Sequence, residues 1–236
     1  MRVALVGYGK MGKIIDEIAT KRGHVIVAKL NETPTAENLK SPDVVIEFSQ
    51  PEVAFSNIKT CLEQKIPVVC GTTGWLSQKP EIEKIAAEND TAFLYGSNFS
   101  LGVNLFFALN EKLAGLMKNF NEYNCQLEEV HHVHKKDAPS GTAISVAEGI
   151  IKNNPKYSGW KLEETMDNEL GIFAIREDEV PGTHSVFYRS EVDEIEIKHT
   201  AFSRNGFALG AVIAAEWIIG KKGNFGMKDV LGLNNL

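Results

Sequence analysis

The chain has 236 residues, of which 43% are hydrophobic and 24% charged, with a formal net charge of -6. This supply of apolar side chains is ample for a buried core and argues against a disordered chain. The acidic balance argues against a nucleic acid or an anionic membrane surface as partner, because binding phosphate needs an excess of Lys and Arg.

Three cysteines, Cys61, Cys70 and Cys125, lack metal-ligand spacing and stand among apolar residues. An odd number of small, core-like thiols is typical of a reducing compartment. The start of the chain has no signal-peptide pattern, and no window approaches the roughly 18 apolar residues needed to span a bilayer. We therefore expect a cytoplasmic protein that does not enter a membrane.

The first hundred residues alternate short apolar runs with helical periodicity. The pattern predicts strands over 3–6, 24–30, 44–48, 66–70 and 91–95, and helices over 10–22, 51–64 and 81–88. Strands and helices that alternate at this spacing predict a doubly wound, Rossmann-type parallel sheet in an α/β fold.

The rhythm changes after Asn98. Helices are expected over 103–118 and 143–152, a strand over 123–130, and antiparallel strands with short polar turns over 171–176, 185–190 and 194–200. This pattern predicts a second, α+β domain with a mixed or antiparallel sheet. An apolar helix over 207–220 is expected to return to the first sheet, so the boundaries are placed at 1–99 with 205–236, and at 100–204.

A glycine-rich turn follows the first strand directly. Gly7, Gly9 and Gly12 fit the pattern G-x-G-x-x-G between a buried strand and a helix. The first glycine permits a tight turn, the second lets the backbone approach a pyrophosphate, and the third allows the helix to pack closely on the strand. We expect a dinucleotide to bind at this turn.

The second predicted strand ends at Leu30, and Asn31 stands where an acidic residue would bind ribose hydroxyls. An amide repels a 2′-phosphate less than a carboxylate does, and Lys10 and Lys29 are candidates to attract one. The choice between NADH and NADPH therefore stays open.

Two further loops follow predicted strands at the ends where ligands collect in parallel sheets. Phe48 and Ser49 form part of one loop, and Gly71-Thr72-Thr73-Gly74 forms the other. Both are expected to face the cofactor, although the second fits a plain polar turn equally well.

The densest chemistry lies between Glu128 and Ala143, where three of the six histidines fall within four positions. Ser140, Gly141 and Thr142 have the small side chains, hydroxyls and free amides of an anion-binding helix start. With Lys135 and Lys136 nearby, the segment suits a small dicarboxylate or a phosphate.

The same segment also fits two roles without an anionic substrate. In the first, Ser140 caps a helix, and solvated lysines and ordinary polar histidines stand beside it. In the second, His131, His132 and His134 bind a metal, but adjacent side chains on an extended chain point to opposite faces and no further ligand completes the set. We expect no metal.

Five motifs together resemble the dihydrodipicolinate reductase (4-hydroxy-tetrahydrodipicolinate reductase) family. They are the glycine turn, Glu47-Phe48-Ser49-Gln50-Pro51, Gly71-Thr72-Thr73-Gly74, Asn98-Phe99-Ser100-Leu101-Gly102-Val103, and His131-His132-x-x-Lys135-x-Asp137-Ala138-Pro139-Ser140-Gly141-Thr142. The chain's last eight residues, 229–236, are also similar to that family's ending, so the resemblance covers nearly the whole chain.

The resemblance implies a two-domain enzyme of lysine biosynthesis through diaminopimelate. Hydride would pass from NADH or NADPH to the ring of a cyclic dicarboxylate, with loss of water. The resemblance also implies that His131 acts as acid or base, that Lys135 donates a proton, and that the chain forms a homotetramer through the second domain. The implied substrate-binding residues are His132, Lys135, Ser140, Gly141 and Thr142. The implied cofactor-binding residues are Gly7, Tyr8, Gly9, Lys10, Met11, Gly12, Asn31, Phe48, Ser49, Gly71, Thr72, Thr73, Ser97, Asn98 and Phe99.

Two other functions compete with this one. Another two-domain dehydrogenase of small carboxylates would share the cofactor domain, and a nicotinamide-sensing binding protein would share the fold without turnover. The sequence departs from the family at Asn31, in a short segment over 152–170, and in an acidic stretch over 177–184.

Overall fold

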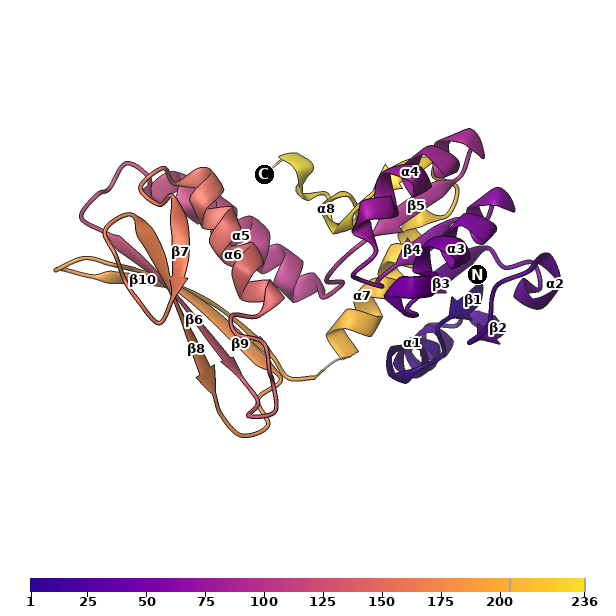
Figure 1. The fold of residues 1–236 in the computed structure, drawn as a ribbon, viewed down its shortest axis with the longest axis horizontal. Coiled ribbons are helices and arrows are strands. Elements are labelled where there is room, and N and C mark those ends of the chain that lie inside the picture. The colour runs from indigo at the N-terminus through magenta and orange to yellow at the C-terminus, as the bar shows by residue number, and fades with distance from the viewer. Residues whose placement is uncertain (204, 236) are drawn as a thin grey trace. The chain divides into compact units, whose positions relative to one another are not determined.

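The computed structural model describes residues 1–203 and 205–235, which fall into two compact units (Figure 1). The first unit comprises Met1–Leu101 together with Asn205–Asn235. The second comprises the described residues from 102 to 203.

The first unit is built on a six-stranded sheet in which all strand pairings are parallel. Its strands are β1 (Arg2–Val6), β2 (Val25–Leu30), β3 (Val44–Glu47), β4 (Val68–Cys70), β5 (Ala92–Tyr95) and β11 (Gly223–Phe225). Their order across the sheet is β11-β5-β4-β3-β1-β2. The four residues of β3 are all buried, as a central strand covered on both faces requires.

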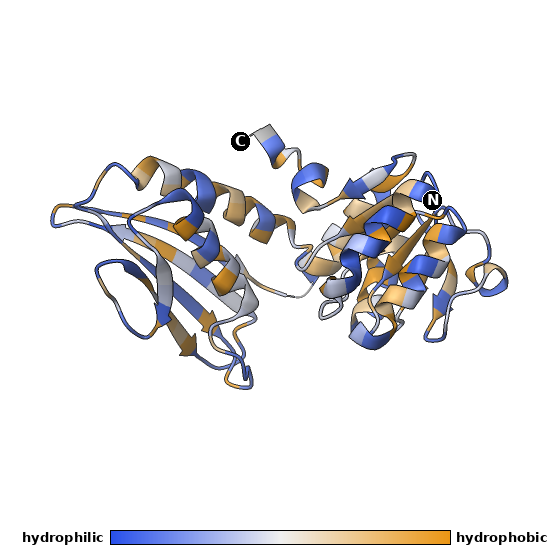
Figure 2. Cartoon of the chain, turned by 45° about the horizontal axis from the view of Figure 1, so that its top comes forward, coloured by the Kyte–Doolittle hydropathy of each residue, from blue (hydrophilic) through white to orange (hydrophobic). Residues whose placement is uncertain are grey.

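Helices cover both faces of this sheet. The helices of the unit are α1 (Lys10–Lys21), α2 (Ala36–Leu39), α3 (Pro51–Glu63), α4 (Lys79–Glu88), α7 (Asn205–Ile218) and α8 (Met227–Val230), with short 3₁₀ turns at Leu76–Gln78 and Leu233–Asn235. One core joins α1 and α7 to the sheet, and the other joins α3 and α4 to it. Figure 2 shows hydrophobic residues along these strands.

The expected doubly wound fold is therefore confirmed. The helix predicted over 207–220 is α7, and its residues Ala208, Ala211 and Ala215 pack on the first sheet as expected. Small alanines allow this apolar helix to lie close to the strands.

The second unit packs two helices on one mixed sheet. Its helices are α5 (Leu101–Met117) and α6 (Gly141–Asn153), and its strands are β6 (Asn124–His131), β7 (Gly159–Leu162), β8 (Glu169–Arg176), β9 (Gly182–Arg189) and β10 (Glu194–Ala201). The strand order is β10-β9-β6-β8-β7. Alternate residues of β6 are buried, with Cys125 and Leu127 in the core beneath the helices.

The sheet of the second unit corrects one part of the sequence prediction. The three strands expected to be antiparallel include β8, which instead runs parallel to both β6 and β7. Strand β6 lies between β8 and β9, so these two do not form the hairpin that their short connection suggests. Strands β9 and β10 do pair antiparallel, and the short elements α2, β7, β11 and α8 were not predicted.

Among the described residues, no helix combines the length and apolar character that crossing a bilayer requires.

Candidate active site

The glycine turn joins β1 to α1 with the geometry expected of it. Gly7 has φ +89°, and a Cβ added there would lie 2.1 Å from the carbonyl oxygen of Phe48. A Cβ at Gly12 would lie 2.5 Å from the Gly7 carbonyl oxygen, so only glycine lets α1 pack against the turn. At Gly9 an added Cβ would meet nothing within 4 Å. The backbone at Gly9 is therefore open to a ligand.

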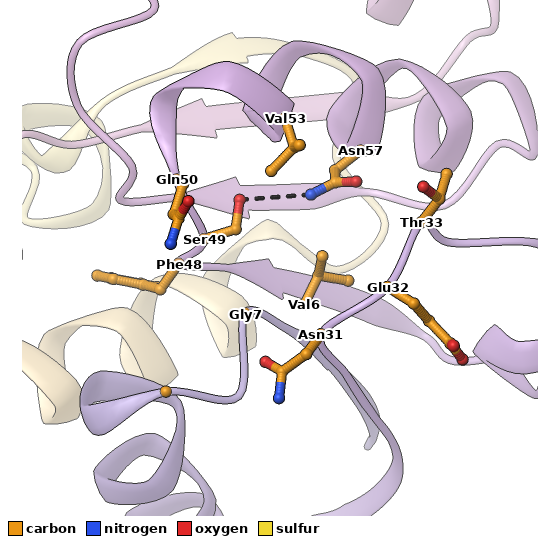
Figure 3. Close-up of a pocket in the computed structure, with 11 residues that line it drawn as sticks. Val6, Gly7, Asn31, Glu32, Thr33, Phe48, Ser49, Gln50, Val53 and Asn57 are labelled. Carbon is orange, nitrogen blue, oxygen red and sulfur yellow. Dashed lines mark hydrogen bonds between the residues drawn. The ribbon is translucent and has the colours of Figure 1, made fainter.

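A cavity of about 460 Å³ lies at the carboxyl ends of β1, β2 and β3 (Figure 3). This is where the strand order reverses, since β2 and β3 flank β1 on opposite sides. Ligands of open parallel sheets bind at such a switch point. The cavity is lined by Val6, Gly7, Gly9, Asn31, Glu32, Thr33, Phe48, Ser49, Gln50, Val53 and Asn57.

The amide of Asn31 is oriented by the glycine turn. Its Oδ1 accepts a hydrogen bond from the backbone N–H of Tyr8 at 2.7 Å, which leaves Nδ2 as the free donor. Asn31 therefore presents hydrogen-bond donors to a ligand, whereas a carboxylate would present acceptors. The side chain of Glu32 extends away from Gly7 in Figure 3.

Lys29 is not free to attract a phosphate. Its Nζ lies 2.6 Å from Oδ2 of Asp16, and the hydroxyl of Tyr8 donates to the same carboxylate oxygen at 2.5 Å. Hydrogen bonding to Lys29 and Tyr8 outweighs burial and lowers the pKa of Asp16. The expectation that Lys29 attracts a 2′-phosphate is weakened by this pairing, whereas Lys10 is exposed at the start of α1.

A buried polar network supports the floor of the cavity. Glu47 is fully buried at the end of β3, and its carboxylate accepts from both the backbone N–H and the hydroxyl of Ser49. The N–H of Ser49 also donates to Oγ1 of Thr72 at 2.8 Å. Asn57 donates to the Ser49 hydroxyl at 3.3 Å, as drawn in Figure 3. Thr72 thus holds Ser49 in place from behind the cavity.

The remaining expected cofactor residues lie in several environments. Gly71 packs against the ring of Phe48, which an added Cβ would approach to 2.2 Å. Phe99 is 2% exposed and belongs to the core. Met11 is partly buried and packs against that core. Thr73 and Ser97 are exposed. Oδ1 of Asn98 accepts a hydrogen bond from the backbone N–H of Ser100, the residue that precedes α5.

In the second unit, the predicted substrate segment leaves β6 and enters α6. The rings of His131 and His132 are buried and half-buried respectively. Lys135, in the loop that follows, holds both carboxylate oxygens of Asp137 at 2.8 Å. The loop is fixed to the end of β8, because Arg176 donates to the carbonyl oxygen of Asp137 at 2.7 Å.

At the start of α6, Ser140 takes the capping role that the sequence allows for it. Its hydroxyl caps the helix by accepting from the N–H of Ala143, and its own N–H donates to Glu129. Gly141 is exposed, and a Cβ there would meet nothing within 4 Å. The donors left for an anion are therefore those of Gly141 and Thr142.

A buried cluster of Glu129, His131 and His184 lies behind this segment. Burial raises the pKa of Glu129, but contacts with His184 and Ser140 outweigh it and hold the pKa at about 2. Burial lowers the pKa of His131 to about 4, against the attraction of Glu129. The cluster therefore contains an ionised carboxylate beside a neutral imidazole at neutral pH.

This cluster also differs from the metal site considered from the sequence. The side-chain ligand atoms of Glu129, His131 and His184 lie within 4.8 Å of one another, whereas His134 is exposed. Arg176 lies 3.3 Å from Oε1 of Glu129. The positive charge of a guanidinium at this distance compensates the negative charge of the carboxylate and repels a metal cation.

Sequence reasoning missed the roles of several residues. Glu129 shares a strand face with His131 because the two are two residues apart, and this spacing could have revealed it. Arg176 and His184 come from β8 and β9, and no local pattern links them to β6. Glu47 and Asn57 were missed because their contacts depend on how α3 and β4 pack.

Comparison with known proteins matches each part of the chain to one family. Residues 1–99 match the family model described as dihydrodipicolinate reductase, N-terminus, and residues 102–231 match that of its C-terminus. The 4-hydroxy-tetrahydrodipicolinate reductase of Christiangramia forsetii is 53% identical over 233 residues, covering 98% of both chains. That of Methanocaldococcus jannaschii is 36% identical, covering 98% of this chain and 82% of the relative.

A solved structure has the same fold. The dipicolinate-bound dihydrodipicolinate reductase from Paenisporosarcina sp. TG-14 aligns with a TM-score of 0.78 and 22% identity, covering 97% of this chain and 98% of the other. The family models together cover nearly the whole sequence, and the glycine turn and the His131–Thr142 segment lie within them. The chain therefore belongs to the dihydrodipicolinate reductase family.

Proposed function

We propose that the chain reduces 4-hydroxy-tetrahydrodipicolinate to tetrahydrodipicolinate with NADH or NADPH, in lysine biosynthesis through diaminopimelate. The observation that carries this proposal is the 53% identity, over 98% of both chains, to a relative with that name. The glycine turn and the His/Lys segment supply the two kinds of site that the reaction needs.

The reaction replaces the ring hydroxyl of the substrate by hydrogen. One hydride and one proton enter, and one water leaves, so that atoms and charges balance. The bound dinucleotide supplies the hydride from C4 of its nicotinamide ring. The protein binds the two reactants, excludes water and handles the proton.

The first unit is proposed as the dinucleotide-binding domain, comprising residues 1–99 and 205–236. The open backbone at Gly9 and the amides at the start of α1 fit a pyrophosphate, because they present donors and a positive helix end. The Asn31 donor lies in the same cavity and fits a ribose oxygen or a 2′-phosphate. These contacts support binding of either nicotinamide cofactor, and the preference between the two stays open.

Residues 100–204 are proposed as the substrate-binding domain. Lys135, His132 and the amides of Gly141 and Thr142 are the donors proposed for the two carboxylates, with Ser140 shaping the helix start. His131 is proposed as acid or base and Lys135 as proton donor. Lys135 is half-buried and paired with both carboxylate oxygens of Asp137, so the proposed roles require it to exchange this partner for the substrate.

The proposal includes a homotetramer formed through the second domain. Helices α5 and α6 cover one face of its sheet, and on the other face Phe173 and Phe187 are only partly buried while Ile175 is 40% exposed. An apolar open face of this kind fits association of sheets. Light scattering during size-exclusion chromatography should give four times the mass of one chain, and a monomer mass would contradict it.

We also place the enzyme in the cytoplasm. Its three cysteines are unpaired and buried, and burial raises the pKa of Cys61 and Cys125 to about 12. Thiols of this kind suit a reducing compartment.

An absorbance assay with freshly generated 4-hydroxy-tetrahydrodipicolinate tests the proposed activity. We expect substrate-dependent oxidation of NADH or NADPH. Oxidation only with another small carboxylate would favour a different dehydrogenase. Tight dinucleotide binding without any substrate-dependent oxidation would favour a binding protein.

A further inference from the structure

Glu129 carries a charge in the interior of the second unit. Its side chain is 0% exposed, and a buried carboxylate needs hydrogen bonds and an opposite charge. The backbone N–H of Ser140 donates to both carboxylate oxygens at 3.1 Å, and Nη2 of Arg176 lies 3.3 Å from Oε1. These contacts join the start of α6 and the end of β8 to one carboxylate on β6.

Two imidazoles face the other oxygen of this carboxylate. Nδ1 of His131 lies 3.4 Å from Oε2, and Nε2 of His184 lies 3.7 Å from it. His184 stands directly opposite Glu129 in the pairing of β6 with β9, and its Nε2 is 3.3 Å from the hydroxyl of Ser140. The strand register thus brings both rings to Glu129.

The charge of Glu129 favours one position for the proton on His131. An ionised carboxylate only accepts hydrogen bonds, so a ring nitrogen turned toward it is stabilised when it carries hydrogen. Nδ1 of His131 is buried, and its 3.4 Å approach to Oε2 of Glu129 does not have hydrogen-bond geometry among the described residues, so the carboxylate acts on this nitrogen through its charge. In the neutral ring a hydrogen on Nδ1 leaves Nε2 unprotonated.

The backbone of β9 leaves room beside Nε2. A Cβ added at Gly182 would lie 3.1 Å from Nε2 of His131, and Gly182 has φ +154°. The ring of His131 is therefore held between Glu129 on its Nδ1 side and a glycine on its Nε2 side. This arrangement keeps a side chain away from the nitrogen that would exchange a proton.

We propose that Glu129 is a positioning residue of the active site. Its carboxylate holds His131 as the tautomer with hydrogen on Nδ1, and it anchors the start of α6 through the amide of Ser140. The proposal rests on the proposed function in one respect, that His131 acts as acid or base. Because its side chain is 0% exposed, Glu129 acts through His131 and Ser140.

Glu129 also sets the charge state of His131. The charged and titratable groups that face His131 are Glu129 on β6, His184 on β9, Lys135 in the loop and Arg176 at the end of β8. Glu129 is the one that raises the pKa of His131, and burial and the other three lower it. Removing the carboxylate charge should lower the pKa of His131 further.

The tautomer can be measured on the unaltered protein without substrate. Nitrogen-15 NMR of the imidazoles at neutral pH, assigned by the signals lost in His131→Gln, should show hydrogen on Nδ1 and none on Nε2 of His131. The opposite tautomer would overturn the proposal. This test holds even if the protein proves to lack reductase activity, so the two failures are distinguishable.

Glu129→Gln provides the kinetic test, because it keeps the side-chain shape and removes the charge. We expect kcat to fall at least about tenfold, as for loss of the group that orients a catalytic histidine. The limb of the kcat/KM pH profile that His131→Gln abolishes should move to lower pH, and the Kd of NADH should stay unchanged. A merely structural role would not move that limb.

Glu148→Gln is the matched control, because Glu148 is an exposed residue of α6 in the same unit. It makes the same charge change and should leave kcat and the pH profile as in the wild type. Wild-type kcat and an unmoved limb in Glu129→Gln would overturn the proposal. If Glu129→Gln does not fold, the tautomer measured in the wild type decides the question alone.

Discussion

Protonation of His131 should contribute to the acid sensitivity of the second unit. Burial lowers the pKa of His131 from 6.5 to about 4, which means that the unfolded chain takes up the proton first as the pH falls. The stability that the neutral ring contributes is therefore complete above pH 6.5 and is lost progressively as the pH falls toward 4. From about pH 7.5 to about pH 5, linkage gives a loss of about 2 kcal/mol from this group.

His131→Gln removes this titration. Over the same pH interval, the free energy of unfolding of the variant should fall by about 2 kcal/mol less than that of the wild type. Trp160 is the one tryptophan of the second unit, so urea unfolding can be followed by its fluorescence with Trp75→Phe and Trp217→Phe in the background. Urea titrations at the two pH values give the two differences.

His134→Gln is the control for this experiment, because His134 lies in the loop that follows His131 and its side chain is 77% exposed. It should leave the pH dependence as in the wild type. Equal losses of stability in the wild type and in His131→Gln would refute the reasoning, because the low pKa of His131 would then not be a property of the folded state.

Three further predictions concern the first unit. Gly9→Val should weaken NADH binding in a titration without lowering Tm, since its side chain enters open space, whereas Gly12→Val should weaken binding and lower Tm, since its Cβ meets a carbonyl oxygen at 2.5 Å. Asn31→Asp should shift the ratio of kcat/KM values toward NADH by about tenfold, because one carboxylate oxygen can accept from Tyr8 while the other accepts from ribose. Lys29→Ala should leave that ratio within about twofold, because Lys29 is already paired with a carboxylate of α1; a larger change would show that Lys29 contacts the cofactor.

The sequence predicted the parts of the fold that local patterns determine. The glycine turn is one example. A side chain at Gly12 would clash with the carbonyl oxygen of Gly7 in the same turn, and one at Gly7 would clash with Phe48 just after β3. The central strands were also found, because an unbroken apolar run suits a strand buried on both faces. The parallel direction of β8 was not predicted. Strands β8 and β9 follow each other in the sequence, but β6 lies between them in the sheet, and no local pattern indicates this.

The site divided in the same way. Lys135 and the start of α6 stand in one continuous segment, so their chemistry could be inferred from residue types. Glu129 lay in that segment too, but its partners Arg176 and His184 reach it only through the pairing of β6 with β8 and β9. The preference of Asn31 for donating hydrogen bonds likewise depends on the N–H of Tyr8, which the sequence does not place.

The steady-state turnover of His131→Gln and Lys135→Ala, with freshly generated 4-hydroxy-tetrahydrodipicolinate, tests most directly whether residues 131–135 carry the chemistry. Each variant should lose about 10² to 10⁴ in kcat, as expected for a positioned acid or base. The Kd of NADH should stay within about twofold of the wild type, because the glycine turn is untouched. Near-wild-type turnover in both variants would contradict the assignment of the chemistry to this segment.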